Sequence, residues 1–363
     1  MIKAGIIGAT GYAGVELFRI LLKHPDVEKI YCSSVSFEGQ QIDAVYQNLL
    51  CQLGNKCNGK LLTADEVKEK SDVIFTALPH GIAEQYADYC VKNGKKLIDL
   101  SADFRYGMDE ETFKTWYKKD WEYPEVHKES VYGSPEMNRE EIKKARVIGN
   151  PGCYVTSATL GLLPALKEGL IATAPIIVDS KSGVTGSGRN PTMSNQFCEC
   201  GESFSVYKVG CHRHQSEIQR NCSIIAGKDV NIVFTPHLIP QNRGILTTIY
   251  APLTDEGIRK IKKIAEEKNC SLAEGVRTIY RDIYDGEPFV RVLPEGVNPT
   301  TRVVRYSNYC DVQVFVVNGG KMLEVVSCLD NMIKGAAGQA VENMNLMYGF
   351  DEKTAIDFIP PAF

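Results

Sequence analysis

The sequence predicts an α/β protein of two domains, and three observations support this prediction. Strand-like and helix-like segments alternate through residues 1–100, which is typical of a parallel sheet with helices on both faces. Segments rich in β-strand signals dominate after residue 153. The length of 363 residues also exceeds what one hydrophobic core usually organises.

The alternating half begins with an apolar strand at residues 3–7, which leads directly into a turn with glycine at positions 8, 11 and 14. The helix after this turn has apolar residues at the spacing of one buried face, namely Val15, Phe18, Leu21 and Leu22. We expect further strands at residues 29–32, 72–77 and 96–100, and a helix at residues 81–93.

The second half has four segments with strand patterns, at residues 175–184, 231–238, 245–253 and 311–317. Residues 329–346 return to a helical pattern, and we expect this helix to pack on the first half. The predicted domains are therefore residues 1–152 with 330–363, and an α+β domain with a mixed sheet at residues 153–329.

The composition favours small-molecule chemistry. With 44% hydrophobic residues, 24% charged residues and a net charge of -4, the chain lacks the basic excess of a nucleic-acid-binding protein. No apolar run approaches the roughly 18 residues of a membrane helix, and the first residues lack the pattern of a signal peptide. We therefore expect a cytoplasmic location and no membrane partner.

The 12 cysteines are scattered from Cys32 to Cys328, so most are expected to be reduced and to be buried as small apolar side chains. Potential zinc ligands do gather in one region, at Cys198, Cys200, Cys211, His212 and His214. Their one-residue gaps differ from the usual two to four residues of a zinc knuckle. We therefore expect no metal.

The glycine turn at residues 8–14 follows a strand and opens a helix, which is the arrangement that binds a dinucleotide pyrophosphate. Glycine lets the backbone approach the phosphates, and the helix N-terminus offers unpaired N–H groups. This indicates a Rossmann-type, doubly wound domain. The next strand ends in Ser33, Ser34 and Ser36 and has no acidic residue, so the sequence favours NADP over NAD, unless these serines only form a turn.

The best candidate for a nucleophile is Cys153, in the segment Gly149-Asn150-Pro151-Gly152-Cys153 before an apolar helical run. A helix N-terminus favours the reactive thiolate form. The Asn150 amide lies beside it in the sequence and completes the candidate site.

Acid–base chemistry near neutral pH needs a histidine, and the chain has six. His24 and His127 occupy polar, surface-like segments, and His80 ends a strand that should face the cofactor. His212 and His214 are the strongest candidates, since a strand would place both on one face. If the segment is helical instead, Glu217 lies one turn from His214 and can orient it. Structural imidazoles remain the alternative.

Cationic side chains near strand ends can bind an acidic substrate. Arg105 follows the predicted strand at residues 96–100, and Lys181 and Arg189 flank a glycine-rich loop. Arginine binds phosphate or carboxylate through a planar fork.

Eight segments together make the sequence resemble the long-chain N-acetyl-γ-glutamyl-phosphate reductase family over almost its whole length. They are Gly8–Gly14, Leu78–Gly81, Leu100–Arg105, Gly149–Tyr154, Lys181–Arg189, His212–His214, Phe234–Pro240 and Lys334–Ala340.

The resemblance implies Cys153 as nucleophile and His214 as acid–base group, with Asn331 or Gln339 near the nicotinamide. It also implies a homodimer or homotetramer. Our full cofactor-binding assignment is Gly8, Thr10, Gly11, Tyr12, Ala13, Ser33, Ser34, Pro79, Ser182, Gly183, Asn331 and Gln339. Our substrate-binding assignment is Arg105, Lys181, Arg189 and His212. One position departs from the family. Val35 follows Ser34 here, whereas the family often has a basic residue at this position.

The predicted reaction is the NADPH-dependent reduction of N-acetylglutamyl phosphate to a semialdehyde and phosphate, through a thioester on Cys153. Two alternatives share this chemistry: aspartate-semialdehyde dehydrogenase, and a reductase of aminoadipyl phosphate. The aminoadipyl substrate has one more methylene, which changes binding by only about 1 to 3 kcal/mol. The sequence therefore distinguishes this reductase poorly from the predicted one. A catalytically silent NADP sensor is the alternative from another class.

Overall fold

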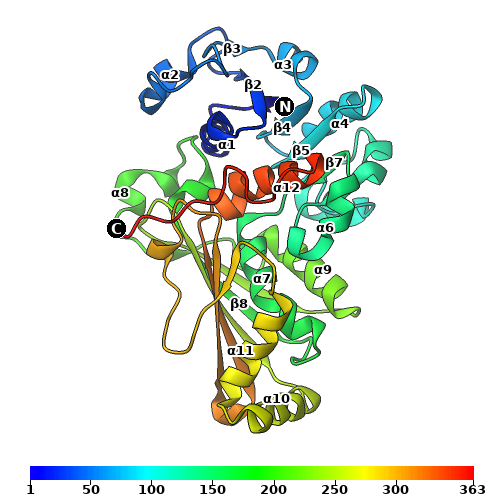
Figure 1. Ribbon diagram of the computed structural model, residues 1–363, viewed down its shortest axis with the longest axis vertical. Coiled ribbons are helices and arrows are strands. Elements are labelled where there is room, and N and C mark those ends of the chain that lie inside the picture. Colours follow the sequence, from blue (N-terminus) through cyan, green and yellow to red (C-terminus); the bar gives the residue numbers. More distant parts are fainter. The chain divides into compact units, whose positions relative to one another are not determined.

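A computed structural model describes all residues from Met1 to Phe363 and divides into two compact units. Unit 1 comprises Met1–Gly152 and Ala336–Phe358, and unit 2 comprises Cys153–Gly335 and Ile359–Phe363. Each unit contains one seven-stranded sheet (Figure 1). The predicted α/β class, with one parallel and one mixed sheet, is confirmed.

The sheet of unit 1 is entirely parallel and has the order β3-β2-β1-β4-β5-β7-β6. Its strands are β1 Ile2–Ile7, β2 Val27–Ser33, β3 Leu61–Leu62, β4 Val73–Thr76, β5 Lys96–Asp99, β6 Ser130–Tyr132 and β7 Val147–Gly149. The order reverses between β1 and β4, which is the switch point at which doubly wound folds bind ligands. The glycine turn lies at this point, directly after β1.

The helices of unit 1 are α1 Tyr12–Lys23, α2 Ile42–Val45, α3 Ala64–Lys70, α4 Ala83–Lys92, α5 Glu110–Tyr117, α6 Pro135–Lys144 and α12 Gly338–Tyr348. Helix α12 packs against α1 and α6, so the end of the chain completes this unit. His24 follows α1, and its Nε2 atom bonds Asn345 Oδ1 of α12 at 2.8 Å. The predicted helix at 329–346 is partly wrong, because residue 329 ends a strand and Ile333–Ala337 form a π-helix.

The mixed sheet of unit 2 has the order β12-β13-β14-β11-β8-β10-β9. Its strands are β8 Ile176–Ser182, β9 Ser205–Val206, β10 Ile232–Leu238, β11 Ile245–Pro252, β12 Val290–Val292, β13 Cys310–Val317 and β14 Met322–Leu329. Strand β14 was not among the strands predicted from the sequence, although it joins β13 to β11.

The helices of unit 2 are α7 Cys153–Lys167, α8 Phe197–Cys200, α9 His214–Ala226, α10 Asp255–Lys268 and α11 Leu272–Ile283. Helices α7, α9 and α11 contact one face of the sheet. On β8 the buried Ile176, Val178 and Ser180 alternate with the exposed Ile177 and the half-buried Asp179, so the other face is uncovered in the single chain.

Helix α7 is buried from Tyr154 to Leu166 although it contains a proline. Pro164 has no N–H group, which removes the helical donor to the Leu160 carbonyl four residues earlier. The hydroxyl of Tyr284 donates to that carbonyl instead, and Tyr280 donates to Gly161 O at 2.8 Å. These tyrosines lie at the end of α11, so α11 supports the middle of α7 where the proline interrupts its hydrogen bonds.

Candidate active site

Cys153 is the first residue of α7 and is half-buried. The predicted entry of a loop into a helix at this cysteine is confirmed. The N–H groups of a first helical turn point toward its start, where they favour an anionic sulfur. The thiol therefore lies where a nucleophile would be activated.

The two candidate histidines lie together at the start of α9. His214 is the first residue of this helix, and its ring centroid is 4.9 Å from that of His212. Tyr154, which follows Cys153, makes edge contacts with both rings at 5.7 and 5.9 Å. The strand that would have placed both histidines on one face does not form; a turn before α9 brings them together instead.

His212 is neutral in this environment. Burial, together with the positive charges of Lys208 and Arg213, lowers its pKa to about 4. Its Nδ1 atom accepts a hydrogen bond from the backbone N–H of His214 at 3.1 Å. In the neutral ring the proton is therefore on Nε2, which makes His212 a hydrogen-bond donor at that atom.

Two tyrosines that the sequence analysis did not single out complete the cluster. Tyr207 donates to the Tyr154 hydroxyl at 3.0 Å, and Tyr154 donates to His237 O at 3.2 Å. Burial raises the pKa of Tyr207 to about 12, opposed by the Tyr154 hydrogen bond and supported by the nearby Cys153 side chain. Both hydroxyls therefore stay protonated. Tyr154 was detectable as the neighbour of Cys153, whereas nothing in the sequence marked Tyr207.

Glu217 lies three residues after His214 on α9 and is completely buried. Residues three apart are neighbours on a helix surface, so the helical alternative for orienting His214 is the one that the fold provides. The Asn221 amide, on the same helix, bonds Thr159 of α7 at 3.4 Å. Helices α7 and α9 thus present the cysteine and the histidines together.

Two glycines of the turn in unit 1 are required by the close packing of the backbone around them. Gly8 has a φ of 90°, and a Cβ atom there would lie 2.4 Å from Ala77 O. A Cβ atom on Gly14 would lie 2.3 Å from Gly8 O. The predicted sequence of strand, turn and helix is therefore present, with Gly11 at the N-cap and Tyr12 and Ala13 in the first turn of α1.

The end of β2 is joined to this turn. Ser33 O accepts hydrogen bonds from the N–H groups of Gly8 and Ala9 at 3.2 and 2.9 Å. The Thr10 and Ser34 hydroxyls are 2.6 Å apart. The structure thus brings the predicted cofactor residues of β1, α1 and β2 together at one sheet edge, and none of the three residues directly after β2 is acidic.

Comparison with known proteins finds that both units resemble domains of semialdehyde dehydrogenases. A family model described as semialdehyde dehydrogenase, NAD binding domain, matches residues 3–145, and the semialdehyde dehydrogenase dimerisation domain matches residues 153–331. The N-acetyl-gamma-glutamyl-phosphate reductase of Clostridium beijerinckii is 47% identical over 363 residues, covering 100% of each chain. That of Brachyspira hyodysenteriae is 44% identical over 371 residues, again covering 100% of each chain.

The chain belongs to the N-acetyl-gamma-glutamyl-phosphate reductase family. As a member it is an oxidoreductase, and unit 1 contains its NAD-binding domain. Its fold is also that of aspartate semialdehyde dehydrogenases. The enzyme II of Vibrio cholerae, complexed with ASA, has a TM-score of 0.68 at 16% identity, with 96% of this chain and 98% of that chain covered. The enzyme of Candida albicans with NADP has a TM-score of 0.66 at 15% identity, with the same coverage.

Gln339 of α12 fits a reductase cofactor that carries an amide. Its side chain is completely buried, and neither amide atom has a hydrogen-bond partner within the protein. A buried amide without partners is unfavourable by about 1 to 3 kcal/mol, so this side chain requires a partner from outside the chain, such as a ligand or an ordered water. The carboxamide of a nicotinamide can both accept from and donate to this side chain.

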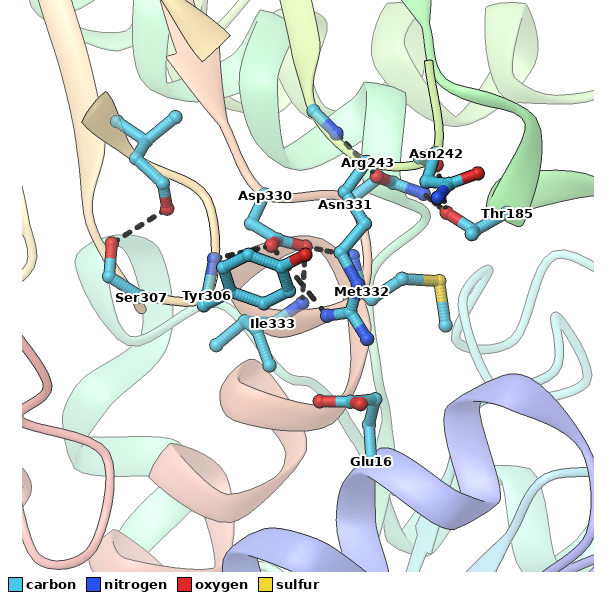
Figure 2. Close-up of polar contacts among 12 residues, drawn as sticks. Glu16, Thr185, Asn242, Arg243, Tyr306, Ser307, Asp330, Asn331, Met332 and Ile333 are labelled. Carbon is cyan, nitrogen blue, oxygen red and sulfur yellow. Dashed lines mark hydrogen bonds and ion pairs between the residues drawn. The ribbon is translucent and has the colours of Figure 1, made fainter. Parts of the chain in front are cut away.

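The amide of Asn331, the other residue that the resemblance places near the nicotinamide, bonds two loops of unit 2. Its Oδ1 atom accepts from Gly244 N at 2.8 Å, and its Nδ2 atom donates to Thr185 Oγ1 at 3.0 Å (Figure 2). Thr185 in turn donates to Asn242 O at 2.6 Å. The Asn331 amide therefore fixes the loop after Ser182 and Gly183.

Gly183 approaches the neighbouring loop closely, since a Cβ atom on it would lie 2.6 Å from Asn242 O. Ser182 is buried, and its hydroxyl donates to Gly183 O at 3.0 Å. Pro79 is exposed in the segment between β4 and α4. Next to it, His80 Nδ1 accepts from Ala102 N at 3.0 Å, and this bond orients its ring.

Arg105 and Asn150 join strand ends within unit 1. Arg105 is buried, and it donates to Asn150 O at 2.7 Å and to Leu100 O at 3.0 Å. The Asn150 amide donates to Ala336 O and accepts from Asn343, both at 3.1 Å. These contacts favour a positioning role for Asn150 over the catalytic role that we predicted.

Lys181 does not join the cysteine cluster. It alternates with the buried Ser180 and Ser182 along β8 and points to the uncovered face of the sheet. There its Nζ atom lies 2.7 Å from Asp179 Oδ2, and His237 Nδ1 lies 3.1 Å from Asp179 Oδ1. The ion pair favours a structural role over the predicted substrate contact. Arg189, by contrast, is exposed on its loop.

Two further expectations need correction. His24 and His127 are buried rather than on the surface, because His24 caps the contact with α12 and His127 stacks on Trp121 at 3.5 Å. All cysteines are free, but only Cys32, Cys57, Cys90, Cys222, Cys310 and Cys328 are buried, fewer than expected.

Of the potential zinc ligands, Cys198 and Cys211 are exposed. No helix is long and apolar enough to cross a membrane.

Proposed function

We propose that this protein reduces N-acetyl-γ-glutamyl phosphate to N-acetylglutamate semialdehyde and inorganic phosphate, with NADPH as the reductant. The family supports this choice of substrate, since relatives named N-acetyl-gamma-glutamyl-phosphate reductase match the chain over its full length. The observation that carries the chemistry is a half-buried cysteine at a helix start, beside a paired His212 and His214.

In the first step the Cys153 thiolate attacks the γ-carbonyl carbon. The bond between that carbon and the phosphate oxygen breaks, inorganic phosphate leaves, and a thioester remains on Cys153. Phosphate leaves as a stable anion, so this step needs no strong acid. The N–H groups at the start of α7 offer hydrogen bonds to the negative charge that develops on the carbonyl oxygen.

When bound, NADPH would supply the hydride that reduces the thioester carbonyl. His214 donates a proton to the resulting oxyanion and takes it back as the carbon–sulfur bond breaks, which releases the aldehyde and restores the thiolate. The neutral His212 donates a hydrogen bond from Nε2 to the substrate. Because it stays unprotonated, it adds no positive charge beside His214. Arg189 is the cation that we assign to an acidic group of the substrate.

Gly8, Gly11, Gly14, Tyr12 and Ala13 would hold the pyrophosphate at the N-terminus of α1. Gln339 would hold the nicotinamide amide. Ser33 and Ser34 would face the ribose 2′-phosphate, which an acidic residue would repel.

The decisive experiment follows NADPH absorbance while the protein is mixed with N-acetylglutamate semialdehyde, NADP and phosphate. Reduction of NADP that requires phosphate, and that is lost in Cys153→Ser, is the expected result. Activity with aspartate semialdehyde alone would assign the protein to that neighbouring activity. NADPH binding without turnover of either aldehyde would indicate the sensor.

We propose further that the protein is a cytoplasmic homodimer formed through the uncovered face of the unit 2 sheet. Ile177 and Val233 expose 42% and 53% of their surface there, on strands within the matched dimerisation domain. Val233→Asp should yield monomers in light scattering. Ile224→Asp, at an exposed apolar residue of α9 on the other side of the sheet, is the matched control and should not. Monomeric wild-type protein would contradict this proposal.

A further inference from the structure

The backbone of Gly335 lies directly against the candidate nucleophile. A Cβ atom on Gly335 would lie 2.8 Å from Cys153 Cβ and 3.3 Å from Cys153 Cα. Real Cβ atoms do not approach another carbon to 2.8 Å, so any side chain at residue 335 must displace the cysteine or the turn. Glycine is therefore required here by the closeness of Cys153, since its own φ is not in the left-handed region.

Gly335 lies in the π-helix Ile333–Ala337, and the main chain of Asp330 holds this turn in place. Asp330 O accepts hydrogen bonds from Gly335 N at 2.9 Å and from Ile333 N at 3.3 Å. π-Helical turns are rare and less favourable than α-helical ones, and they concentrate at functional sites. Such a turn therefore requires hydrogen bonds that hold its first residues in place.

The Asp330 carboxylate provides such hydrogen bonds (Figure 2). It is completely buried, and Oδ1 accepts from Met332 N at 2.7 Å and from Ile333 N at 3.2 Å. Oδ2 accepts from Tyr306 N at 2.7 Å, which connects the turn to a separate segment of unit 2. A buried carboxylate with three N–H donors is strongly held.

A cation completes this arrangement. Arg243 Nη1 lies 3.7 Å from Asp330 Oδ2, and its guanidinium group lies 5.0 Å from the Tyr306 ring centroid. The aromatic ring and the carboxylate together restrain the arginine (Figure 2). The turn that carries Gly335 is thus anchored by charge, by main-chain hydrogen bonds and by the adjacent strand β14.

We propose that Asp330 and Gly335 are positioning residues that set the location of the Cys153 thiol for attack. The anchored turn packs directly against Cys153, the first residue of α7. This close packing is possible only because residue 335 has no side chain. This inference rests on the proposed nucleophilic role of Cys153. Reacting atoms must meet within a few tenths of an ångström, and a misplacement of about 1 Å can reduce a rate about 100-fold.

The test compares Gly335→Ala and Asp330→Asn with a matched control, Gly161→Ala. Gly161 lies two turns further along α7, and its added methyl would meet the end of the Ile249 side chain at 2.9 Å. This control crowds the same helix without touching the cysteine. In Asp330→Asn, Oδ1 can still accept from Met332 and Ile333, but the acceptor for Tyr306 and the charge facing Arg243 are lost.

Two readouts separate positioning from stability. The first is the second-order rate of Cys153 alkylation by iodoacetamide between pH 5 and 10, measured by mass spectrometry on the tryptic peptide of residues 147–167, whose single cysteine is Cys153. The second is kcat and KM in the phosphate-dependent assay. NADPH binding and circular dichroism report whether each variant is folded.

We expect Gly335→Ala and Asp330→Asn to slow alkylation and to lower kcat by about tenfold or more, with KM changed less than threefold. Gly161→Ala should stay within twofold of wild type in both readouts. Folded Gly335→Ala and Asp330→Asn proteins with wild-type alkylation profiles would overturn the proposal, and so would an equal loss in all three variants. If Cys153→Ser retained turnover, the nucleophile assignment itself would fail, whatever the alkylation rates.

Discussion

His212 Nδ1 accepts a hydrogen bond from the backbone N–H of His214 at 3.1 Å. This bond requires an unprotonated Nδ1, which agrees with the lowering of the His212 pKa to about 4 by burial and by Lys208 and Arg213. His212→Asn keeps an acceptor near Nδ1 but loses the Nε2 donor. We expect KM for the semialdehyde to rise about tenfold with a smaller change in kcat, because a lost hydrogen bond to a charged group is worth about 1.5 to 3 kcal/mol. A fall in kcat alone would contradict this role.

The same environment gives a pH dependence whose sign is fixed. A histidine in the unfolded chain takes up a proton below about pH 6.5, whereas folded His212 stays neutral until about pH 4. The unfolded state therefore binds more protons in this window, and the fold loses stability as the pH falls from about 6.5 toward 4. Denaturant unfolding of wild type and His212→Asn should show a smaller loss in the variant.

Much of this site was readable from the sequence because its parts are local. The glycine turn, the cysteine at a helix start and the His212–His214 pair each lie within a few residues, where strand, turn and helix patterns are informative. The tie between Asn331 and Thr185, and the approach of Gly335 to Cys153, join segments more than a hundred residues apart. No local pattern reports such contacts. The face of β8 on which Lys181 lies could not be read from the sequence either, because it depends on which side of the sheet the helices cover.

The buried Gln339 leads to a prediction in which two effects have opposite signs. Gln339→Leu removes two unpartnered buried polar atoms at nearly constant volume. The protein without cofactor should become no less stable, and by up to about 1 to 3 kcal/mol more stable. Affinity for NADPH, followed by fluorescence, should fall about tenfold because the amide contact is lost. A variant that binds NADPH like wild type would exclude Gln339 from the cofactor site.

Val35 offers a gain-of-function test of cofactor choice. This side chain is 95% exposed directly after Ser34, at the position where the family often has a basic residue. Val35→Arg should lower KM for NADPH several-fold, leave KM for NADH unchanged, and make NADPH binding weaken more steeply with salt. Val35→Gln supplies similar length without charge and should match wild type. An equal effect of the arginine on both cofactors would argue against a 2′-phosphate near Ser34.

The last prediction concerns two buried carboxyl groups beneath the strand end that leads to Arg105. Asp99 accepts from the Thr76 hydroxyl at 2.7 Å, from Ser101 N at 3.0 Å and from the Ser101 hydroxyl at 2.6 Å. Burial, together with the negative charge of Asp103, raises the pKa of Asp99 to about 7. Asp103 itself accepts from the N–H groups of Gly81, Ile82 and Ala83 and so holds the start of α4.

Because the folded pKa of Asp99 lies above the unfolded value of about 4, the folded state binds more protons between about pH 4 and 7. Stability should therefore fall as the pH rises through this window, by about 1.4 kcal/mol for each pKa unit. Asp99→Asn resembles the protonated acid, keeping one acceptor for Thr76 and Ser101 N while the Ser101 hydroxyl can turn to accept. Urea unfolding at pH 8 should find this variant more stable than wild type, and at pH 4.5 the difference should shrink. A difference that is constant with pH would show that Asp99 is ionised throughout this range in the folded protein.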